Sequence, residues 1–269
     1  MIKNHVITIV FIATAIFFNC KSNKDQSLKT PQKENWVKLF NGKDLKDWTI
    51  KIKGQPLGKN YKNTFVVDDG VLKVNYDEYN GSFNNSYGHI FYNKAFSSYK
   101  FRMQYRFIGE QIKDGAGWAT RNSGVMIHCE NPKKMGLNQN FPVSIEVQLL
   151  GGLGTGERPT GNLCTPGTHV EMNGELFTPH CINSSSKTFH GDQWVNLEIE
   201  VRNDSIIKHF INGENVLTYS KPQIGGSIDY NEAFWKSKTG TPLKKGYISL
   251  QSESHPVEFK NIEILELQQ

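Results

Sequence analysis

Short segments in which apolar and polar side chains alternate recur along the chain from Trp36 onward. Side chains on a strand point alternately to opposite faces, so this period of two predicts β-strands that each bury one face. The clearest example is the segment 99–108, where large apolar residues alternate with arginine and glutamine. Further strands are predicted within 64–74, 123–129, 143–150, 194–201, 206–214, 246–252 and 257–267.

Two tight turns mark hairpins between these strands. Asp69-Gly70 and Asn212-Gly213 each stand between alternating segments, which is a strong short-range hairpin signal. No amphipathic helix longer than two turns is evident, although 229–238 is predicted to form a short one. Many short strands without strand–helix alternation predict an all-β fold, an antiparallel β-sandwich or jelly roll.

Two long segments fit the strand pattern poorly. They are 109–122 and 151–187, and both are rich in Gly, Thr, Pro and Asn. Loops of this length in a compact domain are usually functional or disordered. Because they adjoin polar strands, we expect them to form the rim of a cleft.

Two predicted strands carry polar residues on the face opposite their apolar side chains. Glu146 and Gln148 alternate with three aliphatic residues in the first strand, and Gln251 and Glu253 follow Leu250 in the second. A merely solvated sheet face would tolerate Lys, Thr or Ser at these positions. Carboxylates alternating with amides are more typical of the floor of a cleft that binds polyols.

His128 is the candidate that would complete this group. Strict alternation puts it on the side of Gly124 and Met126, and it shares a face with Glu146 if their strands are neighbours. A carboxylate and an imidazole can bind a hard or borderline metal ion, so Glu146 and His128 are candidate metal ligands. They can also transfer protons, and Glu253 would join them from a third strand.

Each of these residues also has an ordinary structural interpretation. Glu146 could form an ion pair with Arg121 or Arg102. His128 could be a packed, hydrogen-bonded histidine, and Glu253 could simply be exposed beside a turn. The sequence leaves these alternatives open.

Aromatic residues are the candidate sugar-stacking platforms. Trp118 and Tyr87 could hold the apolar face of a sugar ring, or could instead belong to the core. His180, inside the second long segment, either reaches the cleft or is a loop histidine.

The composition excludes several classes of function. The chain has 269 residues, 12% of them aromatic, and a formal net charge of +5 without a basic run, so nucleic-acid binding is disfavoured. No nucleophile elbow, phosphate-binding loop or HExxH zinc motif is present. The Glu-x-Asp-x-x-Glu strand of retaining sandwich glycosidases is matched only by its first acid, at Glu146, which disfavours an ordinary retaining glycosidase.

The beginning of the chain has the features of an export signal. Residues 6–18 are apolar but too few to span a bilayer, and Cys20 follows directly, so 1–20 is predicted to be a lipoprotein-type signal with lipidation at Cys20. The alternative is an ordinary cleaved signal. Residues 21–35 are predicted to be a flexible tether, and 36–269 a single β-sandwich domain. The expected location is the periplasm, outer membrane or cell envelope.

An exported protein can contain disulfides, and three cysteines remain after Cys20. Cys164 and Cys181 flank a Gly- and Pro-rich stretch and are the favoured pair. By strict alternation Cys129 continues the apolar face of Val125 and Ile127, which predicts a buried thiol.

Several motifs together resemble one bacterial family. The resemblance covers nearly all of residues 36–267 and rests on Trp36-Val37-Lys38-Leu39-Phe40-Asn41-Gly42, Asn122-Ser123-Gly124-Val125, Ile145-Glu146-Val147-Gln148-Leu149, Gly191-Asp192-Gln193-Trp194, Ile211-Asn212-Gly213, Gly246-Tyr247-Ile248-Ser249-Leu250-Gln251 and Val257-Glu258-Phe259-Lys260-Asn261-Ile262. With these motifs the chain resembles the bacterial family known as domain of unknown function 1080, now called the 3-keto-disaccharide hydrolase family. The family pattern often has Arg in place of His128 and Asp-His in place of Ser252-Glu253.

The resemblance implies a concanavalin-like β-sandwich that acts on glycosides already oxidised at C3 of the sugar. A C3 carbonyl acidifies the C2 proton, so a base can remove it while the C1 aglycone is eliminated, and water can then complete a net hydrolysis. Such an enzyme needs a base and a stabiliser for the enolate, for which one divalent metal is a candidate cofactor. On this hypothesis the roles are Glu146 as metal ligand or enolate stabiliser, His128 as general base or ligand, Glu253 as second acid or base, and Gln148, Gln251, Trp118 and Arg121 as substrate-binding residues.

Two rival hypotheses predict different behaviour. A non-catalytic carbohydrate-binding module on the cell envelope would bind unmodified glycans and release no product. A hydrolase of unoxidised glycans would need a second carboxylate facing Glu146.

Overall fold

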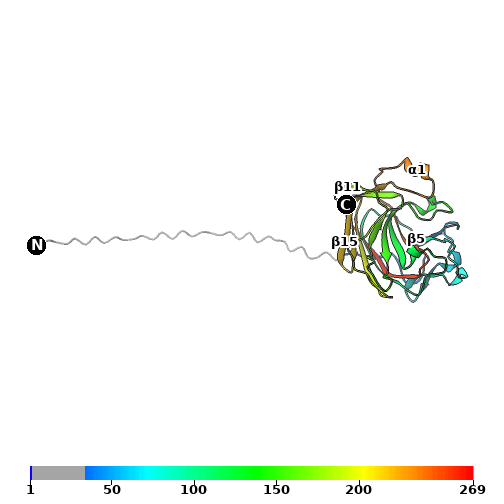
Figure 1. The fold of residues 1–269 in the computed structure, drawn as a ribbon. Coiled ribbons are helices and arrows are strands. Elements are labelled where there is room, and N and C mark those ends of the chain that lie inside the picture. Colours follow the sequence, from blue (N-terminus) through cyan, green and yellow to red (C-terminus); the bar gives the residue numbers. More distant parts are fainter. Residues whose placement is uncertain (2–33, 269) are drawn as a thin grey trace. The chain divides into compact units, whose positions relative to one another are not determined.

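Two antiparallel β-sheets stack face to face in the computed structural model, which describes Met1 and residues 34–268 (Figure 1). Across it, the larger sheet comprises β11 (Glu175–Phe177), β10 (Thr168–Met172), β15 (Glu214–Ile224), β14 (Ile206–Ile211), β13 (Val195–Arg202), β6 (Ser98–Phe107), β17 (Val257–Glu266), β4 (Val71–Val74) and β3 (Phe65–Asp68), with β1 (Val37–Lys38) paired to β17. The smaller sheet comprises β12 (Cys181–Ile182), β9 (Asn162–Cys164), β8 (Ile145–Leu150), β7 (Asn122–Cys129), β16 (Tyr247–Ser252), β5 (Gly88–Tyr92) and β2 (Trp48–Ile52). The predicted β-sandwich is confirmed.

Helical segments are short and lie outside the two layers of strands. The described helix α1 (Glu232–Lys236) falls inside the stretch for which the sequence predicts a helix, and Figure 1 shows it apart from the sheets. Single 3₁₀ turns occur at Tyr61–Asn63, Asp77–Tyr79, Gly117–Ala119 and Pro132–Lys134. None of the helices in the described part of the chain has the length and apolar character needed to cross a membrane.

Both predicted hairpins form with the expected turn geometry. Asp69 and Gly70 have φ of +48° and +74° between β3 and β4, and Asn212 and Gly213 have +49° and +86° between β14 and β15. Two successive positive φ angles define the turn that matches the right-handed twist of the flanking strands. These dipeptides therefore set the register of the hairpins.

The core lies between the sheets and consists of the apolar residues of the alternating pattern. Phe101 on β6 and Ile199 on β13 come from the larger sheet, and Val125, Val147 and Leu250 come from the smaller one. All five side chains are inaccessible to solvent. The opposite face of the smaller sheet is therefore free to carry the polar residues of β7, β8 and β16.

The second long segment is more structured than the sequence predicts. Residues 151–187 contain β9, β10, β11 and β12, of which β9 and β12 extend the smaller sheet beyond β8. These strands have only two to five residues, too few for a period of two to stand out from the surrounding Gly and Pro. The expectation of an irregular loop here is wrong, although part of the segment does border a cavity.

The disulfide between Cys164 and Cys181 is present as predicted, and it joins β9 to the edge strand β12. Cys129 is a buried free thiol, also as predicted. It packs with Phe91 and Met126, however, and not with Val125 and Ile127. Cys20 lies outside the described residues, so its lipidation stays a prediction.

We expect removal of this disulfide to destabilise the fold. The bridge spans 17 residues, and closing a loop of that length lowers the entropy of the unfolded chain by an amount worth about 3 kcal/mol. The variant Cys164→Ser/Cys181→Ser should lose about that free energy of unfolding in urea titrations. A reductant should lower the wild type to the same value and leave the variant unchanged; equal stability of both proteins without reductant would contradict the expectation.

Candidate functional site

A row of polar side chains crosses the outer face of the smaller sheet. Gln148 on β8 lies opposite Asn162 on one side and Gly124 on the other, and the Nδ2 atom of Asn162 donates to Oε1 of Gln148 at 3.0 Å. Gln251 on β16 lies opposite His89 on β5. The prediction that Gln148 and Gln251 leave the core and share the polar face is confirmed.

Glu146 lies next to this row because Gly124 leaves room for it. A Cβ atom on Gly124 would come within 2.7 Å of the Oε1 atom of Glu146. Any side chain at this position would displace the carboxyl group, since real Cβ atoms do not approach so closely. The glycine therefore lets the Glu146 side chain lie against the backbone of β7.

Glu146 and Glu253 form a buried pair of carboxyl groups. Glu146 is 8% exposed and Glu253 is 3% exposed, and both residues line the same cavity. Burial raises the pKa of Glu146 to about 8. Burial, together with the nearby Glu146 carboxylate, raises the pKa of Glu253 well above its usual range. Near neutral pH the pair therefore retains protons that exposed carboxyl groups would have lost.

Within residues 34–268, the two arginines that the sequence offers as partners both bind other carboxylates. Arg102 is bound to Glu263 at 2.7 Å on the other sheet, and Arg121 to Asp192 at 3.1 Å. The alternative in which Glu146 pairs with either arginine is therefore wrong, and so is the alternative of an exposed Glu253. In the described part of the chain, neither carboxyl group has an ion-pair partner, and buried carboxyl groups with raised pKa values cluster at functional sites.

Several buried polar atoms close to the pair have no partner within the described protein. They are Oε2 of Glu253, Oδ1 of Asn122, both amide atoms of Gln251 and Nε2 of His89. An unsatisfied buried polar atom costs about 1–3 kcal/mol, so native proteins usually satisfy such atoms with water, ions or ligands. Their concentration here indicates a site that is built to hold something polar.

The carboxyl pair lies in a cavity of about 380 Å³. Its wall consists of Trp118, Asn122, Phe141, Glu146, Gln148, Cys164, Pro166, His180, Cys181 and Glu253. The disulfide is therefore part of the wall, and His180 reaches the cleft. Both long segments identified in the sequence contribute to the cavity, as expected.

Trp118 is the available aromatic platform. It is 55% exposed on one side of the cavity, and its ring stacks on Tyr87 with centroids 6.1 Å apart and planes 11° apart. Tyr87 is buried behind it. Of the two aromatic candidates, only Trp118 lines the cavity, and Tyr87 supports it by stacking on its ring.

His128 does not join the carboxyl groups. Tyr247 pairs with Cys129 and Ser249 with Met126, so two residues of β7, Ile127 and His128, face a single residue of β16. This β-bulge gives His128 a φ of +51° and reverses the alternation. The prediction that His128 shares the face of Glu146 is wrong.

The ring of His128 instead points toward the other sheet. Its Nε2 atom donates to the carbonyl oxygen of Asn203, in the turn between β13 and β14, at 3.1 Å. The residue is 2% exposed, and burial lowers its pKa to about 4. His128 is the packed, hydrogen-bonded histidine of the alternative interpretation, and it is not placed to act as base or metal ligand beside Glu146.

The predicted metal pair of Glu146 and His128 is consequently not assembled. Within Met1 and residues 34–268, no group of three or more His, Cys, Asp and Glu residues is arranged to hold a metal ion. These residues do not fit the metal site that the sequence suggests, and we derive no chemical step from a metal.

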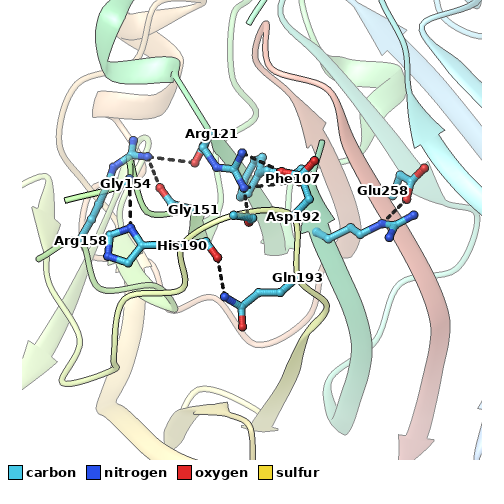
Figure 2. A network of polar contacts seen from close by, with 11 residues as sticks. Phe107, Arg121, Gly151, Gly154, Arg158, His190, Asp192, Gln193 and Glu258 are labelled. Atoms are coloured by element: carbon cyan, nitrogen blue, oxygen red, sulfur yellow. Dashed lines mark hydrogen bonds and ion pairs between the residues drawn. The ribbon is translucent and has the colours of Figure 1, made fainter. Parts of the chain in front are cut away.

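Arg121 is also placed elsewhere than expected. Figure 2 shows its guanidinium between Asp192 and the carbonyl oxygens of Phe107 and Gly191, to which it donates. It is absent from the wall of the cavity. The prediction that Arg121 binds substrate is therefore not supported by its position.

The arginine network has a different use, which is to brace the segment that carries Trp118. Arg158 donates through Nη1 to the carbonyl oxygens of Gly151 at 2.6 Å and Arg121 at 3.2 Å (Figure 2). Its Nη2 atom lies 3.5 Å from the carbonyl oxygen of Trp118. The backbone at Trp118 and at Arg121, which follows it, is thereby held in place.

Sequence reasoning missed His89, Asn122 and Asn162. The strand β5 alternates Gly88, Ile90 and Tyr92 with His89 and Phe91, a signal that could have located His89 on the polar face. Asn162 lies in a strand of three residues, too short for periodicity to reveal. Asn122 stands at the first position of β7, where a pattern gives little information about the direction of a side chain.

Comparison with known proteins agrees with this architecture. Two crystal structures of candidate glycosyl hydrolases from Parabacteroides distasonis ATCC 8503 are similar in fold, each with 19% sequence identity over 87% of this chain. The TM-scores are 0.51 and 0.50, and the matches cover 100% and 94% of those chains. No curated protein sequence matches the chain. The family model for the 3-keto-alpha-glucoside-1,2-lyase-like domain matches residues 35–265, so the chain belongs to this family, as the motifs predict.

Proposed function

We propose that this protein cleaves 3-keto-glycosides by removing the C2 proton and eliminating the aglycone from C1. The observation that carries the proposal is the buried pair of carboxyl groups, Glu146 and Glu253, on the floor of a cavity beside an exposed tryptophan. Membership in a lyase-like family supports a role in carbohydrate chemistry. The carboxyl pair is suited to the proposed removal of the C2 proton and elimination of the aglycone.

The two carboxyl groups differ enough to take separate roles. Glu146 is the more exposed of the two, and we assign it as the general base. Glu253, whose pKa is raised further by the charge on Glu146, stays protonated and is the general acid. Pairs of titratable groups whose surroundings push their pKa values apart are a recurrent basis for acid–base catalysis.

The proposed step balances without an external reagent. The Glu146 carboxylate takes the proton from C2, and the electrons of the C–H bond form a C1–C2 double bond conjugated to the C3 carbonyl. The C1–O bond breaks, and the departing aglycone oxygen receives the proton of Glu253. Addition of water across the double bond would then restore the sugar and complete a net hydrolysis.

The surroundings of the pair fit a sugar ring. Trp118 offers a flat apolar surface for one face of the ring. Gln148 lines the cavity, and the Gln251 amide lies on the same face of the smaller sheet. Both amides can form hydrogen bonds with the hydroxyl groups of the sugar. Water is displaced from the carboxyl groups as the ring enters, which strengthens their electrostatic interactions with the substrate.

Because the structure brings Glu253 to Glu146, hydrolysis of unoxidised glycosides is the second candidate. That reaction needs a carboxylate that stays ionised to stabilise a cationic transition state. Here burial raises the pKa of both groups, so neither is held ionised throughout the reaction as that role requires. A carboxyl group with a raised pKa is a stronger base toward a carbon acid, so the geometry favours elimination over displacement.

The direct test is aglycone release from a 3-keto-glucoside and from the matching unoxidised glucoside, with and without a chelator. We expect release from the keto substrate alone, and a lower kcat/KM for Trp118→Ala with the fold intact. Binding of unmodified glycans without product would support the binding-module alternative. Release from the unoxidised glucoside at a comparable rate would overturn the proposal in favour of ordinary hydrolysis.

A further inference from the structure

The outer face of the larger sheet carries a groove of about 680 Å³. It crosses β17, β6 and β13 and ends at the turn between β14 and β15. The carboxyl pair lies on the outer face of the smaller sheet, so the core of the sandwich separates the groove from the carboxyl cavity. The groove is also nearly twice as large as that cavity. A ligand in the groove would therefore leave the carboxyl cavity open.

An amide ladder, formed by the side chains of Asn261, Gln104, Asn196 and Asn212, crosses this groove. Nδ2 of Asn261 donates to Oε1 of Gln104, and Nε2 of Gln104 donates to Oδ1 of Asn196, both at 2.8 Å. Nδ2 of Asn196 donates to Oδ1 of Asn212 at 3.0 Å. The three bonds run in one direction, so each polarises the next. Every donor nitrogen has a second hydrogen, which is left for a ligand.

A β-bulge in β17 brings Asn261 into the ladder. The register of β17 against β6 shifts between Lys260 and Glu263, and Asn261 has a φ of +54°. Regular alternation after Lys260 would turn Asn261 toward the core and Ile262 outward. With the bulge, Ile262 belongs to the core and Asn261 lines the groove. Bulges recur where a strand re-aims a side chain toward a functional site.

The rest of the groove wall is aromatic or electrically balanced. Phe210 contributes a half-buried aromatic ring. Arg102 is bound to Glu263 at 2.7 Å, and its guanidinium carbon lies 3.9 Å from the ring centroid of Trp36. Glu198 adds a carboxylate, which repels an anionic ligand. Amides, an aromatic ring and a neutralised ion pair together suit an uncharged, hydroxyl-rich ligand.

We propose that this groove is a second glycan-binding site, which holds a neutral polysaccharide chain. Sugar hydroxyl groups both donate to and accept from amides, and the apolar face of a sugar ring can pack on Phe210. Neighbouring strands lie about 4.8 Å apart, so the amides repeat at close to the length of one sugar unit. The site would keep the protein on a polymer, and it is independent of the reaction proposed for the carboxyl pair.

Affinity electrophoresis of the full chain tests the proposal. The native gels contain soluble starch, laminarin or galactomannan, which are neutral, or polygalacturonate, which is anionic. At least one neutral polymer should retard the wild type, and more strongly than polygalacturonate does. Retardation by none of the neutral polymers, or stronger retardation by polygalacturonate than by each of them, would overturn the site.

Two variants remove ladder amides without forcing the backbone. Asn261→Gly keeps a residue that accepts positive φ, and Gln104→Thr puts a good strand former into β6. Each should weaken polymer binding about two- to tenfold, the range for the loss of one neutral hydrogen bond. Urea titrations establish that the variants are folded, and if one is not, the other decides.

The matched control for Asn261→Gly is Asn63→Gly. Asn63 is likewise exposed, has a φ of +47° and donates through Nδ2 to a side-chain oxygen, that of Glu78, but it lies outside the groove. Polymer binding by this variant should equal that of the wild type. Unchanged binding in the ladder variants, or an equal loss in Asn63→Gly, would contradict the proposal.

Two further measurements identify other occupants and other sites. Trp118→Ala changes the carboxyl cavity, so it should leave polymer binding unchanged. Binding that is lost in Trp118→Ala and retained in Asn261→Gly would place the glycan in the carboxyl cavity and refute the groove. Light scattering would reveal a second copy of the chain as the occupant, because a wild-type dimer that dissociates in Asn261→Gly would refute the glycan site as well.

Discussion

Glu146→Gln is expected to lower kcat/KM toward a 3-keto-glucoside on the order of a thousandfold, within the range that general acid–base catalysis contributes. Glutamine has nearly the same shape and still fits over Gly124, but it cannot accept the C2 proton. The free energy of unfolding should not fall, because the substitution removes a buried group whose charged form is disfavoured by burial. Activity and stability should therefore separate in this variant.

The matched control is Glu200→Gln. Glu200 is a carboxylate on the outer face of the other sheet, where it accepts a hydrogen bond from Arg202 at 2.7 Å. Its loss should leave kcat/KM unchanged, since a surface ion pair of this kind contributes little. Initial-rate assays with urea titrations of both variants provide the comparison. Near-wild-type activity in Glu146→Gln would remove the proposed base.

The free energy of unfolding should show a maximum between about pH 6 and pH 7. Buried carboxyl groups lower it at higher pH, and buried histidines lower it at lower pH. Burial raises the pKa of Glu146 to about 8, from 4.5 in the unfolded chain. Between these values the folded protein holds more protons, so this group stabilises the fold at low pH and its contribution is lost as the pH rises toward 8. Glu253 acts in the same direction.

Buried histidines act in the opposite direction on the acid side. Burial lowers the pKa of His89 to about 3 and those of His128, His209 and His255 to about 4, against 6.5 in the unfolded chain. Between 4 and 6.5 the unfolded chain holds more protons, so the stability that these groups contribute is present above pH 6.5 and lost as the pH falls.

The double variant Glu146→Gln/Glu253→Gln separates the two causes. Stability should become nearly independent of pH between 6.5 and 8, whereas the decline below pH 6.5 should be retained. Urea denaturation at four or five pH values measures both slopes. An alkaline slope that persists unchanged in the double variant would show that the carboxyl groups are not buried as a pair.

The sequence was most informative where one local rule controls the structure. Hairpin dipeptides such as Asp69-Gly70 fix their turns through positive φ, and alternation along β6 and β8 correctly separates core residues from polar ones. The polar positions Glu146 and Gln148 could be recognised for the same reason. Their strands have regular pleats, so counting by two gives the correct face.

Prediction failed where the backbone departs from regularity or where a partner comes from a distant segment. A single extra residue in β7 turns His128 to the inner face of the sheet and places Cys129 on the outer face. The amino-acid sequence of the strand does not indicate this bulge. Arg121 was assigned to substrate, but its partner Asp192 is 71 residues away and its position follows from tertiary packing. In the proposed reaction the role of base is therefore assigned to Glu146 and not to His128.

The most direct measurement is the kinetic isotope effect on kcat/KM for a 3-keto-glucoside carrying deuterium at C2. Abstraction of that hydrogen at the carboxyl pair predicts a normal primary effect, well above unity, in the wild type. A value of one, combined with a normal rate of aglycone release and independence from Glu146, would contradict C2 proton removal and with it the function assigned to the cavity.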